Sequence, residues 1–365
     1  MKQRKADIIY FTKYTDKGPS SRYRSYQYKH YFEKDLVINY FPFFDDQYIE
    51  NLYNGKATNY LKVFLLYLER ILISIKFLGT NKIVFVEYEL LPYFPPILEY
   101  LLYKTNVKLI LDYDDAIFHN YDLNSNFFIR NLLKNKIPTI VKYSSTVIAG
   151  SPYLYDYLCQ FNKNVVEIPT SINFTNCNIN FRLKDSIDDI SIGWIGSKST
   201  SINVINIKEV IIKILYINPK IKFKFMGFDS SLKTQLNFSN VEFFEWSEKN
   251  ELFFLNEIDL GIMPLDDNPF NRGKCGFKLI QYMAMGKPTL STPLEANVKI
   301  NRGNNNLFAT TNEQWLNCII EFSNNLEYYR EVGKKNRIIV EKYYSVDNNS
   351  IIYSNIFKQI LNVRN

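Results

Sequence analysis

Residues 272–288 read Arg-Gly-Lys-Cys-Gly-Phe-Lys-Leu-Ile-Gln-Tyr-Met-Ala-Met-Gly-Lys-Pro, and they join a loop rich in glycine and positive charge to a short apolar segment of helical character. Gly273 and Gly276 allow the backbone to turn and to approach a ligand closely. Backbone amides at the start of the following helix attract anions. The positive charge comes from Arg272, Lys274 and Lys278. The segment therefore predicts an anion site, and a diphosphate is the anion that fits best.

Two strand-like segments flank this loop and helix. Residues 258–265 form an apolar run that ends at a loop, and residues 289–292 follow the helix as a second short run. The order strand, loop, helix, strand is typical of a parallel α/β sheet, in which ligands bind beyond the carboxyl ends of the strands. Gly276 and Phe277, at the junction of loop and helix, are therefore candidate ligand-binding residues.

The segment resembles the C-terminal domain of GT-B glycosyltransferases of the group 1 (family 4) type. That family has a Glu-x7-Glu loop and helix, and its ending is similar to Tyr-Met-Ala-Met-Gly-Lys-Pro at 282–288. Both acidic positions differ here, because Gly273 stands at the first and Gln281 at the second. The second Glu hydrogen-bonds the donor ribose in the family, and an amide also hydrogen-bonds a hydroxyl. The resemblance thus implies that Gln281 contacts the ribose, and that Gln281→Glu keeps or improves donor affinity.

The length of the chain fits two domains. A chain of 365 residues exceeds one ordinary domain. Strand-like runs alternate with helical ones, and the pattern restarts after a polar stretch near residues 175–188. This predicts an α/β fold with two Rossmann-like, doubly wound parallel-sheet domains that face a central cleft, as in GT-B proteins. We expect an acceptor-side domain at 1–178, a donor-side domain at 188–345, and a helix at 346–365 that packs back on the first domain.

Composition narrows the function classes. The net charge of +7 favours anionic partners, but the basic residues are dispersed among acids without a nucleic-acid-binding motif, so we expect no nucleic-acid partner. The four cysteines form no C-x-x-C pair, which argues against a zinc site or a disulfide framework. The location and the remaining enzyme classes can also be narrowed. No signal peptide and no apolar run of about 18 residues is evident, which favours a location in the cytoplasm. A dinucleotide-dependent oxidoreductase is disfavoured, because the first βα unit lacks G-x-G-x-x-G. No cofactor is expected.

The first predicted turn carries Lys-Gly-Pro-Ser-Ser-Arg at 17–22. Similar glycine loops with a following arginine face the cleft in the family, which makes Gly18 and Arg22 candidate donor-binding residues. The alternative is a simple turn in which Ser20 or Ser21 caps the next helix.

Residues 110–119 read Ile-Leu-Asp-Tyr-Asp-Asp-Ala-Ile-Phe-His. In this segment the acidic residues come directly after the end of a predicted strand. Asp114 and Asp115 are candidate general bases or ligands of the acceptor hydroxyl, with helix capping as the alternative. His119 is a further catalytic candidate, although such a histidine is more often packed or solvated. Asp112 and Asp114 also spell the D-x-D metal signature of GT-A glycosyltransferases. We disfavour that interpretation because the cations at 272–278 already neutralise phosphate.

The second half begins with Trp-Ile-Gly-Ser-Lys-Ser-Thr at 194–200, which resembles the glycine loop on the donor side of the family. Amides beyond Gly196 and the hydroxyl of Ser197 are suited to a phosphate, and strand-to-helix capping is the alternative. Trp246 follows a later strand, at the level where the family holds its nucleobase. It is a candidate for base stacking, with a buried core tryptophan as the alternative.

Residues 60–76 form a very apolar helical segment with basic residues interspersed. A core helix that covers the N-terminal sheet explains it most simply. A helix pressed on a membrane that carries a lipid-linked acceptor is the alternative.

Together these features predict a metal-independent glycosyltransferase of the cytoplasm, with peripheral contact at the inner face of the membrane as an option. The resemblance to the family implies that the configuration of the sugar is retained. The expected partners are a nucleotide-diphosphate sugar and a glycan or lipid-linked acceptor of surface polysaccharide synthesis. Arg272 and Lys278 would stabilise the charge that develops on the leaving diphosphate. A non-catalytic nucleotide-sugar or glycan-binding protein with a degenerate transferase fold is the alternative, because both family acids are absent.

Overall fold

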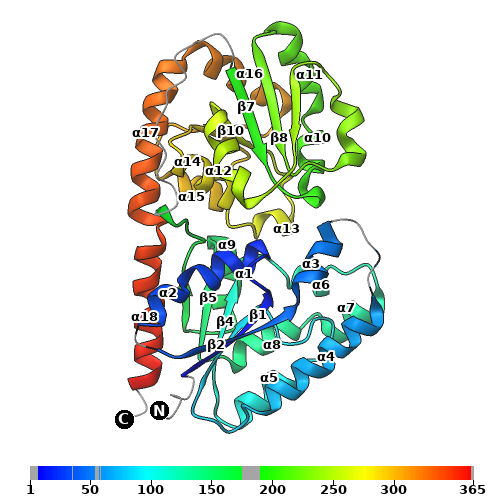
Figure 1. Ribbon diagram of the computed structural model, residues 1–365, viewed down its shortest axis with the longest axis vertical. Helices are drawn as coiled ribbons and strands as arrows, with labels where there is room; N and C mark the ends of the chain where they lie inside the picture. Colours follow the sequence, from blue (N-terminus) through cyan, green and yellow to red (C-terminus); the bar gives the residue numbers. More distant parts are fainter. Residues whose placement is uncertain (1–6, 35, 54–56, 58, 175–189, 363–365) are drawn as a thin grey trace. The chain divides into compact units, whose positions relative to one another are not determined.

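The computed structural model describes residues 7–34, 36–53, 57, 59–174 and 190–362 of the chain (Figure 1). The chain divides into two compact units. The first unit comprises Met1–Ser171, Gly273–Cys275 and Val346–Asn365, and the second comprises Ile172–Arg272 and Gly276–Ser345. Three residues of the glycine-rich loop thus belong to the first unit, while the helix after them belongs to the second.

The first unit is built on a six-stranded sheet in the order β2-β1-β3-β4-β5-β6, with parallel pairing throughout. Ile8 of β1 pairs with Ile38 on one side and with Ile83 on the other. The chain leaves β1 toward β2 and then returns to the other side of β1, so the strand order reverses between β1 and β3. The strands are β1 (Ile8–Tyr14), β2 (Ile38–Phe44), β3 (Ile83–Glu87), β4 (Lys108–Tyr113), β5 (Thr146–Ala149) and β6 (Val165–Glu167).

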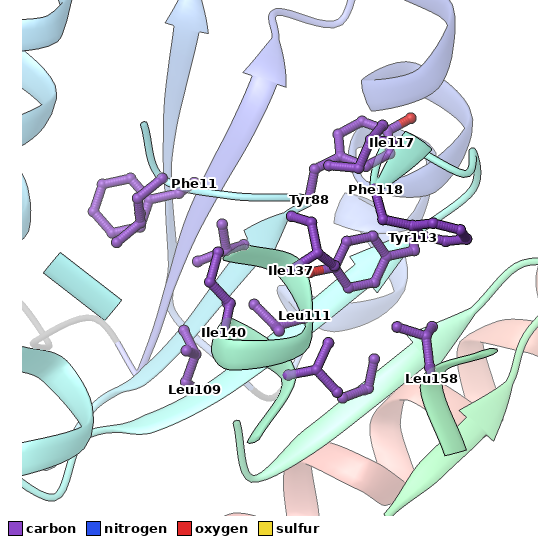
Figure 2. Packing of buried hydrophobic residues seen from close by; sticks show 14 of the residues in the cluster. Phe11, Tyr88, Leu109, Leu111, Tyr113, Ile117, Phe118, Ile137, Ile140 and Leu158 are labelled. Carbon is purple, nitrogen blue, oxygen red and sulfur yellow. The ribbon is translucent and has the colours of Figure 1, made fainter. Parts of the chain in front are cut away.

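Helices cover both faces of this sheet, which explains why its central strands are apolar without alternation. On one face Leu109 and Leu111 of β4 share a core with Ile137 and Ile140 of α8 (Figure 2). The helices of this unit are α1 (Pro19–Arg24), α2 (Lys29–Phe32), α3 (Asp46–Tyr53), α4 (Tyr60–Ile75), α5 (Ile97–Lys104), α6 (His119–Asp122), α7 (Phe127–Leu133), α8 (Lys136–Tyr143), α9 (Pro152–Cys159) and α18 (Val346–Asn362), with a 3-10 turn at Tyr26–Tyr28.

The opposite face of the first sheet receives the C-terminal helix α18. Its Tyr353 and Phe357 are fully buried in one cluster with Tyr10 and Phe85. The rings of Phe357 and Tyr10 meet edge to face, with their centroids 6.4 Å apart. The last helix of the chain is therefore part of the core of the first unit.

The second unit has a six-stranded parallel sheet in the order β12-β11-β10-β7-β8-β9. This is the strand order of dinucleotide-binding folds, and it reverses between β7 and β10. Ligands of such sheets bind beyond the carboxyl ends of the two strands at the reversal. The strands are β7 (Ile190–Ile195), β8 (Ile221–Met226), β9 (Val241–Phe244), β10 (Leu260–Met263), β11 (Thr289–Ser291) and β12 (Leu307–Phe308).

Helix α14 of the second unit lies very close to its neighbours. A Cβ at Gly261 of β10 would stand 2.2 Å from the ring of Tyr282, and one at Gly333 would stand 2.1 Å from the carbonyl oxygen of Gly286. These glycines allow the close approach. The helices of this unit are α10 (Ile202–Ile205), α11 (Lys208–Ile217), α12 (Glu248–Glu257), α13 (Pro269–Arg272), α14 (Phe277–Ala284), α15 (Glu295–Asn301), α16 (Asn312–Asn324) and α17 (Leu326–Tyr343), with 3-10 turns at Lys198–Thr200 and Ser230–Leu236.

Among the described residues, no helix has both the length and the apolar character that crossing a bilayer requires. Helix α4 packs on the core of the first unit through Tyr67, Ile71 and Ile73, as the core-helix interpretation predicts.

Candidate functional site

Gly196 stands at the carboxyl end of β7, where the second sheet reverses its strand order. Its N–H donates to the carbonyl of Met226 at 3.0 Å, which ties the turn to β8. A Cβ at this position would lie 2.3 Å from the ring of Trp194 and 2.8 Å from Nζ of Lys278. Only glycine leaves room for both side chains, so the turn, the tryptophan and the lysine form one packed group.

Lys278 comes from the first turn of α14 and joins this group. Its Nζ lies 3.5 Å from Oγ1 of Thr200 and 4.5 Å from the ring centroid of Trp194. The aromatic face favours the ammonium group electrostatically and fixes its place. The structure thus brings Lys278 to the Gly196 turn, two positions that are 82 residues apart in sequence.

The turn after Gly196 is capped locally. The N–H of Ser197 donates to Oγ1 of Thr200 at 3.1 Å, and Oγ of Ser197 lies 3.1 Å from Oγ of Ser199. The capping interpretation of these residues is therefore correct as a description of the turn. It is compatible with a phosphate site, because several hydroxyl groups gather next to one ammonium group.

The start of α14 is shaped by Gly276, which caps the helix with a φ of 64°. A Cβ there would stand 2.4 Å from Ile300, so glycine is needed both for the conformation and for the space. Phe277 follows as the first helical residue and packs, partly buried, against the core of the second unit.

Gln281 and Trp246 both contact Glu251 of helix α12. Nε2 of Gln281 donates to Oε1 of Glu251 at 2.6 Å, and Nε1 of Trp246 donates to Oε2 at 2.9 Å. Gln281 and Glu251 are 5% and 8% exposed. Gln281 and Trp246 are candidates from the sequence alone, but Glu251 is not. Nothing in the local pattern marks an acid of α12 as the partner of a residue 30 positions later.

Two cations of the predicted anion site, Arg272 and Lys274, form ion pairs with acidic residues in this structure. Arg272 forms a bidentate ion pair with Asp267: Nε donates to Oδ1 at 2.5 Å and Nη2 donates to Oδ2 at 3.0 Å. Both side chains are about half exposed. Lys274 belongs to the first unit, where its Nζ lies 3.1 Å from Oδ1 of Asp115. The carboxylate of Asp115 raises the pKa of Lys274. Of the three predicted cations, Lys278 is the one that the structure places at the Gly196 turn.

In the first unit the acids after β4 have separate environments. Arg24 donates to both carboxylate oxygens of Asp112, at 3.0 and 2.5 Å, and both residues are almost fully buried. Asp112 is therefore committed to an internal ion pair. Asp114 accepts a short hydrogen bond from the hydroxyl of Tyr88. Burial, together with the neighbouring Asp115, raises the pKa of Asp114 to about 6.

Buried polar residues also gather where the first sheet reverses its strand order. Glu87 ends β3 and accepts from the hydroxyls of Ser21 and Ser25, at 2.6 and 2.5 Å, and from the N–H of Lys13 at 2.9 Å. Burial raises the pKa of Glu87 to about 7. The next residue, Tyr88, has a φ of 63°, which a bulky side chain rarely adopts.

The remaining predicted residues of the first unit are held by local contacts. Gly18, and neither Ser20 nor Ser21, caps helix α1. Arg22 stacks over the ring of Tyr23, with 4.8 Å to the centroid. Nδ1 of His119 lies 2.9 Å from Asp122, and Nε2 lies 2.9 Å from the hydroxyl of Tyr153. These contacts of His119 fit a packed histidine, which is the alternative to a catalytic one.

The sequence of the chain is similar to that of one curated protein. The chain is 24% identical over 190 residues to TuaH of Bacillus subtilis strain 168, whose name proposes a role as a glycosyltransferase of teichuronic acid biosynthesis. The match covers 48% of this chain and 47% of TuaH, so it spans less than half of that protein. No family model matches the sequence.

Three solved structures are similar to this chain in fold. HepE from Anabaena, solved with UDP, superimposes with a TM-score of 0.72 at 11% identity, over 97% of this chain and all of HepE. A glycosyltransferase from Rickettsia africae gives a TM-score of 0.69 at 14% identity, over 98% and 99% of the two chains. Sucrose-phosphate synthase from Thermosynechococcus elongatus gives 0.63 at 13% identity, over 84% and 81%. The two parallel sheets with flanking helices are those of the GT-B fold, which confirms the predicted fold class.

Proposed function

We propose that the protein is a glycosyltransferase that moves a sugar from a nucleotide-diphosphate donor to a glycan or lipid-linked acceptor in surface polysaccharide synthesis. The observation that carries this proposal is the group of Gly196, Thr200 and Lys278 at the strand-order reversal of the second sheet. Glycine, hydroxyl groups and one fixed ammonium group at such a reversal suit a diphosphate. The similarity to TuaH and to HepE, which binds UDP, supports the same donor class.

The chemistry follows from the charge that develops during sugar transfer. Negative charge grows on the departing diphosphate as the glycosidic bond breaks, and Lys278 is already oriented by Trp194 to stabilise it. Arg272 is a second candidate if it exchanges Asp267 for phosphate. Asp114 supplies a base for the acceptor hydroxyl, because its raised pKa of about 6 brings it closer to neutral pH.

We further propose that transfer needs no metal ion and retains the configuration of the sugar. Support for metal independence comes from Asp112, whose two oxygens are held by Arg24, so the D-x-D pair would have to give up a buried ion pair to bind a cation. Retention rests on the resemblance of residues 272–288 to the family 4 type.

A non-catalytic nucleotide-sugar-binding protein is the second candidate, because Gly273 and Gln281 replace both family acids. The two candidates differ in turnover. A panel of nucleotide-diphosphate sugars is titrated by calorimetry, and each donor that binds is then tested for release of free nucleotide with and without added glycan or lipid-linked acceptors. Binding with turnover supports the enzyme, binding alone supports the second candidate, and absence of binding to every donor contradicts both.

Peripheral contact with the inner face of a membrane is part of the proposal, and helix α4 supports it. The side of this helix that faces the core carries Arg70 and Ser74, and Arg70 donates to the carbonyl of Thr12 at 2.9 Å. Its solvent side carries six exposed apolar residues, from 42% at Leu68 to 69% at Leu61, and Glu69 is also exposed. We name the six apolar residues the lipid face; they are Leu61, Phe64, Leu65, Leu68, Leu72 and Ile75.

A bilayer surface suits the lipid face better than a second copy of the chain. At 16 residues, α4 is too short to cross a hydrocarbon core of about 30 Å, so it would lie in the interface plane. Lys76 after α4 and Lys104 at the end of α5 are exposed and suit anionic headgroups. Two copies that met through this face would bring the same lysines toward one another.

Vesicle co-sedimentation tests this contact. Full-length protein should sediment with phosphatidylglycerol-containing vesicles, and Leu65→Glu with Leu72→Glu should abolish sedimentation without unfolding the protein. Tyr216→Glu, at an exposed position of α11, is the matched control. Unchanged sedimentation of the double variant contradicts the lipid face, and loss of a dimer in sizing experiments would assign the face to a second copy instead.

A further inference from the structure

The contact between Gln281 and Glu251 fixes which way the Gln281 amide points. Nε2 of Gln281 lies 2.6 Å from Oε1 of Glu251, and both side chains are more than nine-tenths buried. An ionised carboxylate only accepts hydrogen bonds, so the amide must turn its NH₂ group toward Glu251. Oε1 of Gln281 is thereby left as the acceptor on the other side of the amide.

The same carboxylate also orients Trp246. Its second oxygen accepts from the indole Nε1 at 2.9 Å, so one acid of α12 holds one side chain that follows β9 and another that lies within α14. Trp246 and Gln281 are the two residues to which the family resemblance assigns the nucleobase and the ribose. Their shared partner lies in the second unit, as both of them do.

We propose that Glu251 is a positioning residue for the nucleoside of the donor, and that Glu251 and Gln281 together do what a single carboxylate at position 281 would do. Gln281 presents Oε1 to a ribose hydroxyl, and the negative charge of Glu251 polarises the amide and strengthens that oxygen as an acceptor. The acid missing at position 281 is thus supplied by a neighbouring helix. This inference rests on the proposed function, because it assumes a donor with a ribose.

The pair reverses one expectation from the sequence. The resemblance to the family predicts that a Glu at position 281 keeps or improves donor affinity, because the family has Glu there. In this structure it would place two carboxylates about as close as the present 2.6 Å contact, where like charges repel strongly. We expect Gln281→Glu to weaken UDP binding by about tenfold or more at pH 8, because the repelled side chain leaves its position or takes up a proton.

Exchange of the two residues is the decisive variant. Glu251→Gln with Gln281→Glu restores one acid and one amide, so we expect UDP affinity to return to within about threefold of the parent protein. Glu251→Ala should weaken UDP binding at least tenfold, since the amide and the indole both lose their partner. Glu248→Gln, at an exposed position of the same helix, is the matched control and should leave affinity unchanged.

Two readouts separate positioning from a structural role. Gln281→Glu alone should gain UDP affinity as the pH falls from 8 to 5, because one proton shared between two carboxylates removes the repulsion. 2′,3′-Dideoxy-UDP lacks the ribose hydroxyls, so Gln281→Leu should weaken UDP binding and leave dideoxy-UDP binding unchanged. Equal losses for UDP and dideoxy-UDP, or an exchange variant as weak as Gln281→Glu, would overturn the proposal.

The melting temperature (Tm) without any ligand distinguishes failure of the proposed function from failure of the positioning role of Glu251. Gln281→Glu should lower Tm and the exchange variant should recover it, because the contact exists in the free protein. If this coupling is found but neither UDP nor any other nucleotide binds the parent protein, the proposed function fails and the pair is purely structural. If nucleotides bind the parent protein and the exchange rescues Tm without rescuing affinity, the positioning role alone is wrong.

Discussion

A Cβ atom on Gly273 would stand 2.3 Å from the Cβ of Ala116, closer than two such atoms can approach. The similar family has its first motif acid at this position, and here the first unit leaves no room for any side chain. The loss of that acid is therefore tied to close packing of the loop. Whatever the acid does in the family must be done by another group in this chain, or be dispensable.

Restoring the family acid should consequently be harmful. Gly273→Glu is expected to lower the free energy of unfolding by about 1–3 kcal/mol, the usual effect of overpacking a filled site. Urea unfolding followed by circular dichroism measures the change. Ala116→Gly removes one of the clashing atoms, so the double variant should recover part of the loss. A Gly273→Glu protein of undiminished stability would show that the loop has space to move.

Removal of the Lys278 charge should damage transfer far more than folding. Lys278→Met keeps an unbranched side chain, one atom shorter, next to Trp194 but loses the ammonium group. We expect a loss of on the order of 2–4 kcal/mol in transition-state stabilisation. The ratio kcat/KM for the donor reports it. Lys213→Met, at an exposed position of α11, serves as control. Near-normal kcat/KM in Lys278→Met would remove Lys278 from the site.

The alternation of strands and helices was sufficient to predict both sheets, because a parallel strand buried on two faces leaves a continuous apolar run. The Gly196 turn and α14 were found because glycines and cations are visible locally. The side-chain partners of the candidate residues could not be predicted in this way. Glu251 reaches Gln281 across 30 positions, and Arg24 reaches Asp112 across 88, so no periodic pattern connects them. Burial of an acid becomes evident only once the tertiary fold supplies its donor.

The Arg24–Asp112 ion pair leads to a prediction about metal. We expect donor turnover to persist in EDTA, because Asp112 is held internally and Lys278 supplies the positive charge. Arg24→Met should destabilise the fold by about 3–5 kcal/mol, since it leaves a buried carboxylate unpaired, and Asp112→Asn should recover part of that loss. Turnover that EDTA abolishes and manganese restores would contradict the metal-independent mechanism.

Asp114 should make both the turnover and the stability of the protein depend on pH. Its pKa in the folded protein is raised to about 6 from an ordinary 3.8, so the folded state holds its proton more tightly than the unfolded chain does. The contribution of Asp114 to stability is therefore fully present below the unfolded pKa and is lost as the pH rises through about 6. As a base, Asp114 works only when ionised, so turnover should fall as the pH drops below about 6. Asp114→Asn should remove this pH dependence.

The same substitution should separate activity from stability. Asparagine still accepts a hydrogen bond from Tyr88 but carries no charge, so Asp114→Asn is expected to raise the Tm at pH 8 and to leave it nearly unchanged at pH 4. Turnover at pH 8 should fall by about 10²- to 10⁴-fold, the usual contribution of a general base. Asp122→Asn, on the neighbouring helix α6, is the control for loss of a nearby carboxylate. A variant that is more stable at pH 8 and still fully active would assign the base to another residue, with Asp115 the first to test.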